Sequence, residues 1–301
     1  MKWAVIASWS AAMDGAKKIA ELLEQGEEYD IAAMIGATIV EDDPLCSAAG
    51  LGSLPDAAGR VQLEAGFMDG NTLRFGAVAD LEGYRSPIRI ACSLAKRHDN
   101  TFLTGQGASE YAKNNGFEQR NNLTEEASAI YEQERKRGGK KHVSGGLGNI
   151  SFLVKDIRGS FCAATTASGL FLKEAGSIGS SPLPGAGYYA DSDIGAAAST
   201  GTGNEVNKGV RSILAVTYMK MGYSAQEAVD KAVLELDEQL LRRTGRAYPV
   251  SLIALDRDGN FGVATNVPYT FVYGSDVCPV SLYEALPSEE GTMIHAVHRN
   301  L

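Results

Sequence analysis

The chain has 301 residues, 44% of them hydrophobic, which is enough to bury one large core or two smaller ones. Its formal net charge is −9, with 28 Lys and Arg against 37 Asp and Glu, and this balance argues against a nucleic-acid-binding protein. No apolar run is long enough to span a membrane, so we expect no membrane partner.

The four cysteines predict reduced thiols. They are far apart in the sequence and form no CxxC pair and no Cys/His spacing typical of a metal site. We therefore expect mostly buried thiols in a cytoplasmic protein that needs neither a metal nor another cofactor. They are Cys46, Cys92, Cys162 and Cys278.

The first residues predict a strand followed by two helices. MKWAVIASWSAAMDG loosely resembles a signal peptide, but its apolar run is short and lacks a convincing cleavage site. We expect a first β-strand over residues 3–8. Apolar residues at helical spacing then predict helices over residues 13–25 and 30–40.

Two more helices are expected before mid-chain. Ser86 and Pro87 give the cap and the first residue of a helix that runs to about Arg97. Residues 124–137 are acidic at their start and basic at their end, which suits the helix dipole. The basic cluster at 135–142 is expected to be a solvated linker.

The Gly/Ser-rich residues 142–148 divide this helical half from a strand-rich one. They predict either a simple loop or a processing junction. In GGLGNISFLVKD (145–156) the glycine-rich run ends abruptly and a strand-like stretch begins, with Asn149 at the junction. Several hydrolase folds expose a catalytic side chain at such a place, yet an amide is a poor nucleophile.

An internal repeat predicts two hairpins. Residues 151–165 and 251–265 share Ser, Asp, Gly, Phe, Ala and Thr at matching positions. Each copy reads as a strand, an Asp-x-x-Gly turn and a second strand. Two hairpins of one design indicate two packed antiparallel sheets or two halves of one sheet.

Between the hairpins lie two predicted helices. The first covers residues 205–221. The second opens at Ser224, where Glu227 completes a capping box, and runs to about Arg243 before Gly245 ends it. This order of elements indicates sheets with helices outside them.

Three glycine-rich stretches are candidates for building a site: GGLGN (145–149), GSIGSSPLPGAGYYAD (176–191) and ASTGTGN (198–204). Backbone N–H groups at a glycine-rich helix start can bind an anion or an oxyanion. The four histidines fall in apparent loops or tails, and we expect surface positions for His98, His142, His295 and His298.

Taken together, the motifs resemble the glycosylasparaginase and type 2 asparaginase (isoaspartyl peptidase) family of N-terminal-nucleophile hydrolases. They extend over essentially the whole chain in the family's order, and glycosylasparaginase is the nearer branch. The matching stretches are EDDP (41–44), GLGSLPD (50–56), MDG (68–70), GAV (76–78), SPLPGAG (181–187), YAD (189–191), GAAA (195–198) and TG (200–201).

The resemblance implies an α/β (α+β) fold, a four-layer αββα sandwich. Family members are made as one chain that cuts itself before a Thr, and the freed Thr is both nucleophile and, through its α-amine, base. By this pattern, residues 1–301 form a single domain with an α-subunit-like half (1–148) and a β-subunit-like half (149–301). A homodimer is the expected assembly.

The resemblance also places the family's site residues, and most are replaced. The nucleophile position holds Asn149, after Gly148, where the family commonly has Asp. What matches is the oxyanion-hole pair Thr200-Gly201 and the aromatic position, Trp9. The remaining substrate-binding positions are the second Thr (Ala167), the carboxylate-clamping Arg (Ser177), the amine-holding Asp (Ser180) and a pocket Ser (Ala48).

These replacements predict the loss of the family's usual activity. Removing a nucleophile lowers the rate by on the order of a million-fold. Losing an Arg–carboxylate contact weakens binding by roughly 2–5 kcal/mol more. Asn149 alone could be an engineered trap, whereas five coordinated changes indicate natural loss. Ser151, on the same strand face, is a possible alternative nucleophile, and cyclisation of Asn149 is another route.

We therefore expect an uncut chain without asparaginase activity. Its pocket, lined with Asn149, Ser177, Ser180, Ser181 and Thr200, would take a neutral small ligand, or the chain would pair with a catalytic relative. The first alternative is an active amide hydrolase of the glycosylasparaginase or isoaspartyl peptidase type with an unusual nucleophile. The second is a purely structural role.

Overall fold

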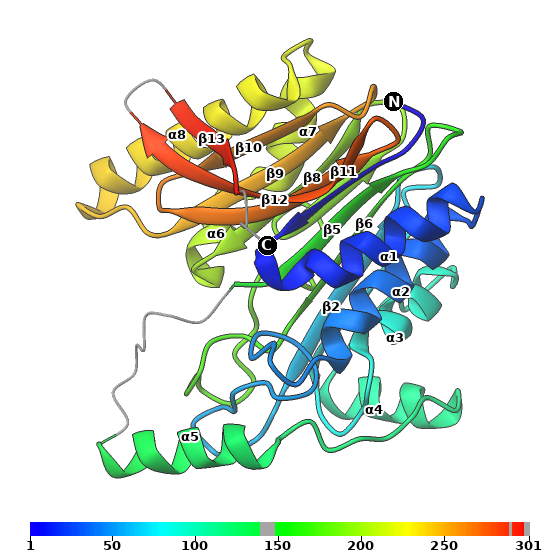
Figure 1. The fold of residues 1–301 in the computed structure, drawn as a ribbon. Helices are drawn as coiled ribbons and strands as arrows, with labels where there is room; N and C mark the ends of the chain where they lie inside the picture. The colour runs from blue at the N-terminus through cyan, green and yellow to red at the C-terminus, as the bar shows by residue number, and fades with distance from the viewer. Residues whose placement is uncertain (139–147, 289–290, 298–301) are drawn as a thin grey trace.

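Two stacked β-sheets with helices on both outer faces form the molecule (Figure 1). The computed structural model describes residues 1–138, 148–288 and 291–297. The layers follow the order helix, sheet, sheet, helix, so the predicted four-layer αββα sandwich is confirmed.

The larger sheet has nine strands in the order β13-β12-β11-β1-β5-β6-β2-β3-β4. Neighbours are antiparallel except β3 and β4. Groups of strands from before and after residue 148 follow one another in this order, so both parts of the chain build one sheet. The strands are β1 (Ala4–Ser8), β2 (Leu63–Asp69), β3 (Phe75–Leu81), β4 (Phe102–Thr104), β5 (Ile150–Lys155), β6 (Phe161–Ala167), β11 (Tyr269–Ser275), β12 (Cys278–Ser288) and β13 (Gly291–Ala296).

The smaller sheet has four antiparallel strands in the order β10-β9-β8-β7. Helices α6, α7 and α8 cover its outer face (Figure 1). The strands are β7 (Tyr188–Asp191), β8 (Gly195–Gly201), β9 (Val250–Asp256) and β10 (Phe261–Thr265), and the helices are α6 (Gly203–Gly209), α7 (Arg211–Lys220) and α8 (Ala225–Thr244).

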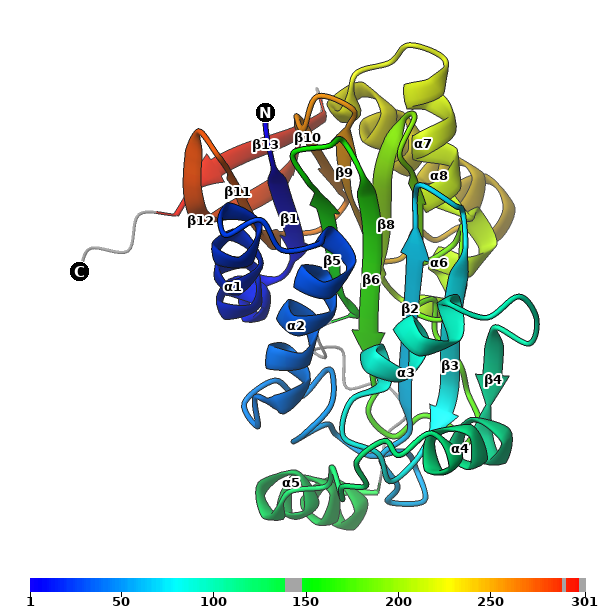
Figure 2. The same ribbon diagram turned by 90° about the vertical axis from the view of Figure 1, so that its right-hand side faces the viewer.

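Helices of the first half cover the other outer face. α1, α2 and α3 pack on the larger sheet, α4 lies near its β3–β4 edge, and α5 lies at one end of the molecule (Figure 2). They are α1 (Met13–Glu24), α2 (Tyr29–Asp42), α3 (Pro87–Ala95), α4 (Gly105–Asn114) and α5 (Glu125–Lys136), with a short 3-10 turn at Ser10–Ala12.

Three apolar layers fill the spaces between these elements, and strand alternation decides which residue faces which layer. Along β5, Ile150, Phe152 and Val154 pack towards the helices, whereas Leu153 packs towards the second sheet. By the same alternation Asn149 and Ser151 lie on the sheet–sheet side, which is where the candidate site forms.

Both predicted hairpins are present, β5–β6 in the larger sheet and β9–β10 in the smaller one. The two sheets, rather than halves of one, are therefore what the repeat builds. The turns match as well. In each turn, the Oδ1 of the Asp, Asp156 or Asp256, accepts hydrogen bonds from the backbone N–H groups of the second and fourth residues after it, at 2.8–2.9 Å.

The helix predicted over 205–221 is wrong in one respect, because it is broken into α6 and α7. Val210 adopts a left-handed conformation with φ of 50° directly after Gly209, a residue that weakens a helix interior. A second expectation is also wrong: His295 lies in β13 and not in a loop, although it is exposed as predicted. His142, His298 and the second half of the basic cluster, residues 139–142, lie outside the described residues.

The predicted signals at both ends of α8 are confirmed. Ser224 and Glu227 form the capping box of α8, and Gly245 ends it with φ of 71°. Thr124 caps α5. All four cysteines are free, three of them buried and Cys278 partly buried. None of the described helices is long and apolar enough to cross a membrane.

Candidate functional site

The candidate site lies between the two sheets, at the end where β5 and β2 begin and β6 ends (Figure 2). Asn149 immediately precedes β5 and is only 6% exposed. A buried polar side chain needs hydrogen-bond partners, so its contacts define the local geometry.

The amide group of Asn149 bridges the two sheets. Its Nδ2 donates to the backbone oxygen of Ser199 on β8 at 3.0 Å and to Ser151 Oγ at 3.1 Å. Ser151 is itself 1% exposed, and its N–H donates to Ser8 Oγ at 2.7 Å. The hydroxyl of Ser151 is therefore occupied by the Asn149 amide and shut off from solvent.

Two hydroxyls also fix the backbone of Asn149. Ser8 Oγ donates to its carbonyl oxygen at 3.0 Å, and Thr200 Oγ1 donates to the same oxygen at 3.3 Å. Trp9 Nε1 donates to Thr200 Oγ1 at 3.3 Å. The chain around residue 149 is thus held by β1 and β8 together.

Trp9 has an unusual backbone, with φ of 65°. Such a conformation is uncommon for a bulky residue and persists only where surrounding contacts fix it. Its N–H bonds Thr270 O at 2.9 Å, and its ring meets Tyr269 edge-on at 4.8 Å between centroids. These contacts hold the indole beside Thr200.

Glycines at 148 and 201 allow the close packing of this site. A Cβ on Gly148 would lie 2.2 Å from Thr200 Oγ1. Gly201 has φ of 136°, and a Cβ there would lie 2.2 Å from Pro249 O. A side chain at position 148 would displace Thr200, and one at position 201 would push the end of β8 away from Pro249.

A cavity of about 60 Å³ opens beside Asn149. The residues that the sequence placed in the pocket and that line this cavity are Ala48, Asn149, Ala167, Ser177, Ser180, Ser181 and Gly201. Trp9, Ser151 and Thr200 do not line it but lie behind Asn149, joined to it by the bonds above.

Two charged residues of this cavity were missed by the sequence reasoning. Glu64 on β2 and Lys173 in the loop after β6 line this cavity, and Glu64 Oε1 lies 3.6 Å from Lys173 Nζ. Their side chains are 1% and 5% exposed. The available signal was a lone carboxylate inside the apolar strand pattern of β2.

The carboxylate of Glu64 is fixed in place. The N–H of Gly179 donates to both oxygens, at 2.9 Å and 3.1 Å. Burial raises the pKa of Glu64 above its usual value, and the charge of Lys173 and the Gly179 N–H oppose that rise. The cavity thus has one acidic and one basic group side by side.

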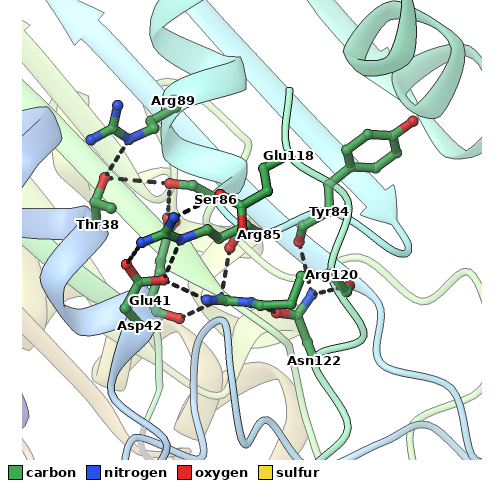
Figure 3. Close-up of polar contacts among 10 residues, drawn as sticks. All are labelled: Thr38, Glu41, Asp42, Tyr84, Arg85, Ser86, Arg89, Glu118, Arg120 and Asn122. Carbon is green, nitrogen blue, oxygen red and sulfur yellow. Dashed lines mark hydrogen bonds and ion pairs between the residues drawn. The ribbon is translucent and has the colours of Figure 1, made fainter. Parts of the chain in front are cut away.

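A polar network supports the site from the helical side of the larger sheet (Figure 3). Glu41 at the end of α2 is fully buried, and its Oε1 accepts from Thr166 Oγ1 on β6 at 2.7 Å and from Ile88 N at 3.0 Å. Ser86 Oγ donates to Oε2 at 2.5 Å. The Ser86 hydroxyl therefore serves Glu41 and does not cap α3 as the sequence predicted.

Next to Glu41, Asp42 joins two loops to α2. It pairs with Arg85 at 2.8 Å and with Arg120 at 2.6 Å (Figure 3). Arg120 also donates to the backbone oxygens of Glu41 and Arg85, at 3.0 Å each. Thr166 is followed by Ala167 of the cavity, so this network anchors the cavity wall.

Among the described residues, no group of three or more His, Cys, Asp or Glu side chains is placed to hold a metal ion. The chemistry that the site offers is hydrogen bonding: amide, hydroxyl and backbone groups around Asn149, and one carboxylate–ammonium pair.

Comparison with known proteins gives consistent matches. The family model described as asparaginase matches residues 6–276. The N(4)-(beta-N-acetylglucosaminyl)-L-asparaginase of Elizabethkingia miricola is 33% identical over 263 residues, 86% of this chain and 77% of that protein. The plant-type L-asparaginase of Pyrobaculum calidifontis is 32% identical over 276 residues, 86% and 90%. The human isoaspartyl peptidase/L-asparaginase is 34% identical over 215 residues, 69% of each.

Proposed function

Because this chain belongs to the asparaginase family, we propose that it is a member that neither cuts itself nor hydrolyses the asparagine side-chain amide, and that its remodelled pocket binds a small ligand of no net charge. The resemblance of the sequence motifs implies that the position of the family's nucleophile falls on Asn149, whose side chain has no hydroxyl to attack a carbonyl. Loss of a nucleophile is expected to lower the rate by about a million-fold.

The observation that carries this proposal is the bonding of the Asn149 amide. Its nitrogen donates to Ser199 O and Ser151 Oγ, so the amide is engaged in fixing the strands. An amide nitrogen that donates two hydrogen bonds has no activated lone pair for nucleophilic attack. The serines at 177 and 180, where the family clamps the substrate's charged ends, support a ligand of no net charge.

Self-cleavage is tested on a denaturing gel and by intact mass. The expected result is one species near 31.9 kDa. Two fragments of about half that mass, produced by cleavage of the bond between Gly148 and Asn149, would refute the proposal. The matching activity test measures aspartate or ammonia released from asparagine, β-aspartyl peptides and glycosyl-asparagine, and no release above background is expected.

The second candidate function is an active amide hydrolase with an altered route. The family membership favours it, since the relatives are named as asparaginases and an isoaspartyl peptidase. Ser151 would then be the nucleophile, and it would first have to give up the Asn149 amide. Turnover that S151A abolishes would establish this candidate in place of the first.

We also propose a homodimer in a reducing compartment such as the cytoplasm, which agrees with four unpaired thiols. A catalytic relative as partner is the alternative. Sedimentation of the purified chain alone distinguishes them, because only a homodimer forms without a second protein.

A further inference from the structure

The pair Glu64–Lys173 is a binding feature that the lost amide chemistry does not use. Both side chains are almost fully buried, yet both line the open cavity. They are the only charged residues that line it among the described part of the chain. Buried charges are found where they are paired, and this pair has a net charge of zero.

The pair presents one donor and one acceptor side by side. Lys173 Nζ lies 3.6 Å from Glu64 Oε1, and an ammonium group carries three protons, so the contact with Glu64 leaves protons for a further acceptor. Glu64 Oε2 accepts one N–H, from Gly179 at 3.1 Å, and a carboxylate oxygen can accept more than one. A ligand that both accepts and donates, through neighbouring atoms, fits this pair.

The size of the cavity limits the ligand. About 60 Å³ is roughly the volume that two water molecules occupy in the liquid. The cavity therefore takes two neighbouring polar groups of a ligand, and the rest of a larger ligand would extend through the cavity's opening. The lining also includes Ser177, Ser180 and Ser181, whose hydroxyls can accept and donate.

We propose that the cavity binds a small neutral vicinal diol, with one hydroxyl oxygen accepting from Lys173 Nζ and the neighbouring hydroxyl donating to Glu64 Oε2. This proposal deepens the proposed function and rests on it, because it assumes an uncut chain with an open pocket. Propane-1,2-diol, glycerol and the edge of a sugar ring have this pattern.

A diol fits this pair better than a charged ligand does. A ligand with one net charge would leave an uncompensated charge in a site where the two protein charges already balance. A zwitterion would balance them, but two full charges would have to lose their water, which costs far more than desolvating two hydroxyls. Because the charges of Glu64 and Lys173 already balance each other at 3.6 Å, the cost of desolvating a charged ligand favours a neutral one.

The test measures binding of two isomers by saturation-transfer NMR and calorimetry on the full chain. Propane-1,2-diol is expected to bind saturably, and propane-1,3-diol, which lacks neighbouring hydroxyls, about tenfold more weakly, as for loss of one hydrogen bond to a charged group. Because K173M alone leaves Glu64 unpaired, the double variant E64Q/K173M is used, and it is expected to lose the preference between isomers. The matched control is K208M, which removes an exposed lysine that pairs with Glu205 on α6. This variant should keep the preference for propane-1,2-diol.

Three results would overturn the proposal: equal affinity for the two isomers, glycine or acetate binding more tightly than either diol, or an unchanged preference in E64Q/K173M. None of these bears on the proposed function, which fails instead on the gel and the amide-hydrolysis assay. The two proposals can therefore fail separately.

Discussion

Replacing Glu41 by glutamine should stabilise the protein above neutral pH. Glu41 is fully buried, and its carboxylate accepts from three neutral donors, of which Figure 3 draws Ser86. Among the described residues, no cation pairs with this carboxylate; Arg120 contacts the backbone oxygen of Glu41 instead. Burial raises its pKa from 4.5 to about 7, against the hydrogen bonds of Ser86, Thr166 and Ile88 N, which lower it. An acid whose folded-state pKa is raised destabilises the fold once it must ionise.

The size of the effect follows from that shift. Between pH 4.5 and about 7 the folded state holds a proton that the unfolded state has lost, so stability from this group falls as pH rises through that window. Above it the penalty is complete, at about 3 kcal/mol for a shift of this size. A glutamine at this position would resemble the protonated acid and carry no such penalty.

The substitution also preserves the local bonding. The side-chain oxygen of the glutamine would keep the contacts with Thr166 and Ile88 N, and its NH2 would donate to Ser86 Oγ. Ser86 could then donate to Thr38 Oγ1, which lies 3.3 Å away. No buried polar group is left unpaired, which is the condition for a neutral replacement of a buried acid.

The assay is urea denaturation of the wild type and E41Q at about pH 5 and about pH 8, with the free energy of unfolding compared at each. The advantage of E41Q should be small at the lower pH and up to about 3 kcal/mol at the higher. A difference independent of pH would refute the reasoning. D42N is the control. Burial raises the pKa of Asp42, but Arg85 and Arg120 outweigh burial and hold this pKa below its usual value. The charged form of Asp42 therefore stabilises the fold, and D42N should lose stability at neutral pH.

Three further predictions concern the site. N149A removes both donors of the amide, to Ser199 O and Ser151 Oγ, and should lower the free energy of unfolding by about 1–3 kcal/mol in urea, whereas no change would show that these bonds are not formed. S151A leaves the bond to Ser199 O, so its loss should be about 1 kcal/mol at most. G148A should lower the melting temperature through contact with Thr200 Oγ1, and T200A in the same chain should recover part of that loss, giving a double-mutant coupling that independent sites would lack.

Local signals in the sequence predicted the elements whose structure depends on a few neighbouring residues. The capping box at Ser224 and Glu227 and the turns of the two hairpins depend on residues within four positions of one another. The break between α6 and α7 was missed because it depends on tertiary packing: α7 must lie on β8 and α8, and Val210 takes a left-handed conformation to allow it.

The candidate site was predictable where the chain resembles a family and not where a distant contact decides. Position 149 and the positions of Ala167, Ser177 and Ser180 followed from motif order, and the structure brings them to one cavity. Glu64 and Lys173 are far apart in sequence, and although a carboxylate inside an apolar strand pattern is a signal, nothing near Glu64 in the sequence indicates Lys173 as its partner. They become a buried pair only in the folded protein, where β2 packs beside the loop after β6.

Gly148 and Asn149 are matched to their surroundings as a pair, which explains why one substitution should not restore the family's chemistry. A threonine at position 149 would supply a hydroxyl, but its single O–H could not serve both Ser199 O and Ser151 Oγ, as the Asn149 amide now does. The residue before it cannot regain a side chain without displacing Thr200, whose hydroxyl holds the carbonyl of residue 149. Thr200, which the resemblance to the family assigns to the oxyanion hole, already donates to the carbonyl oxygen of residue 149, and the cavity beside Asn149 is lined by Glu64 and Lys173.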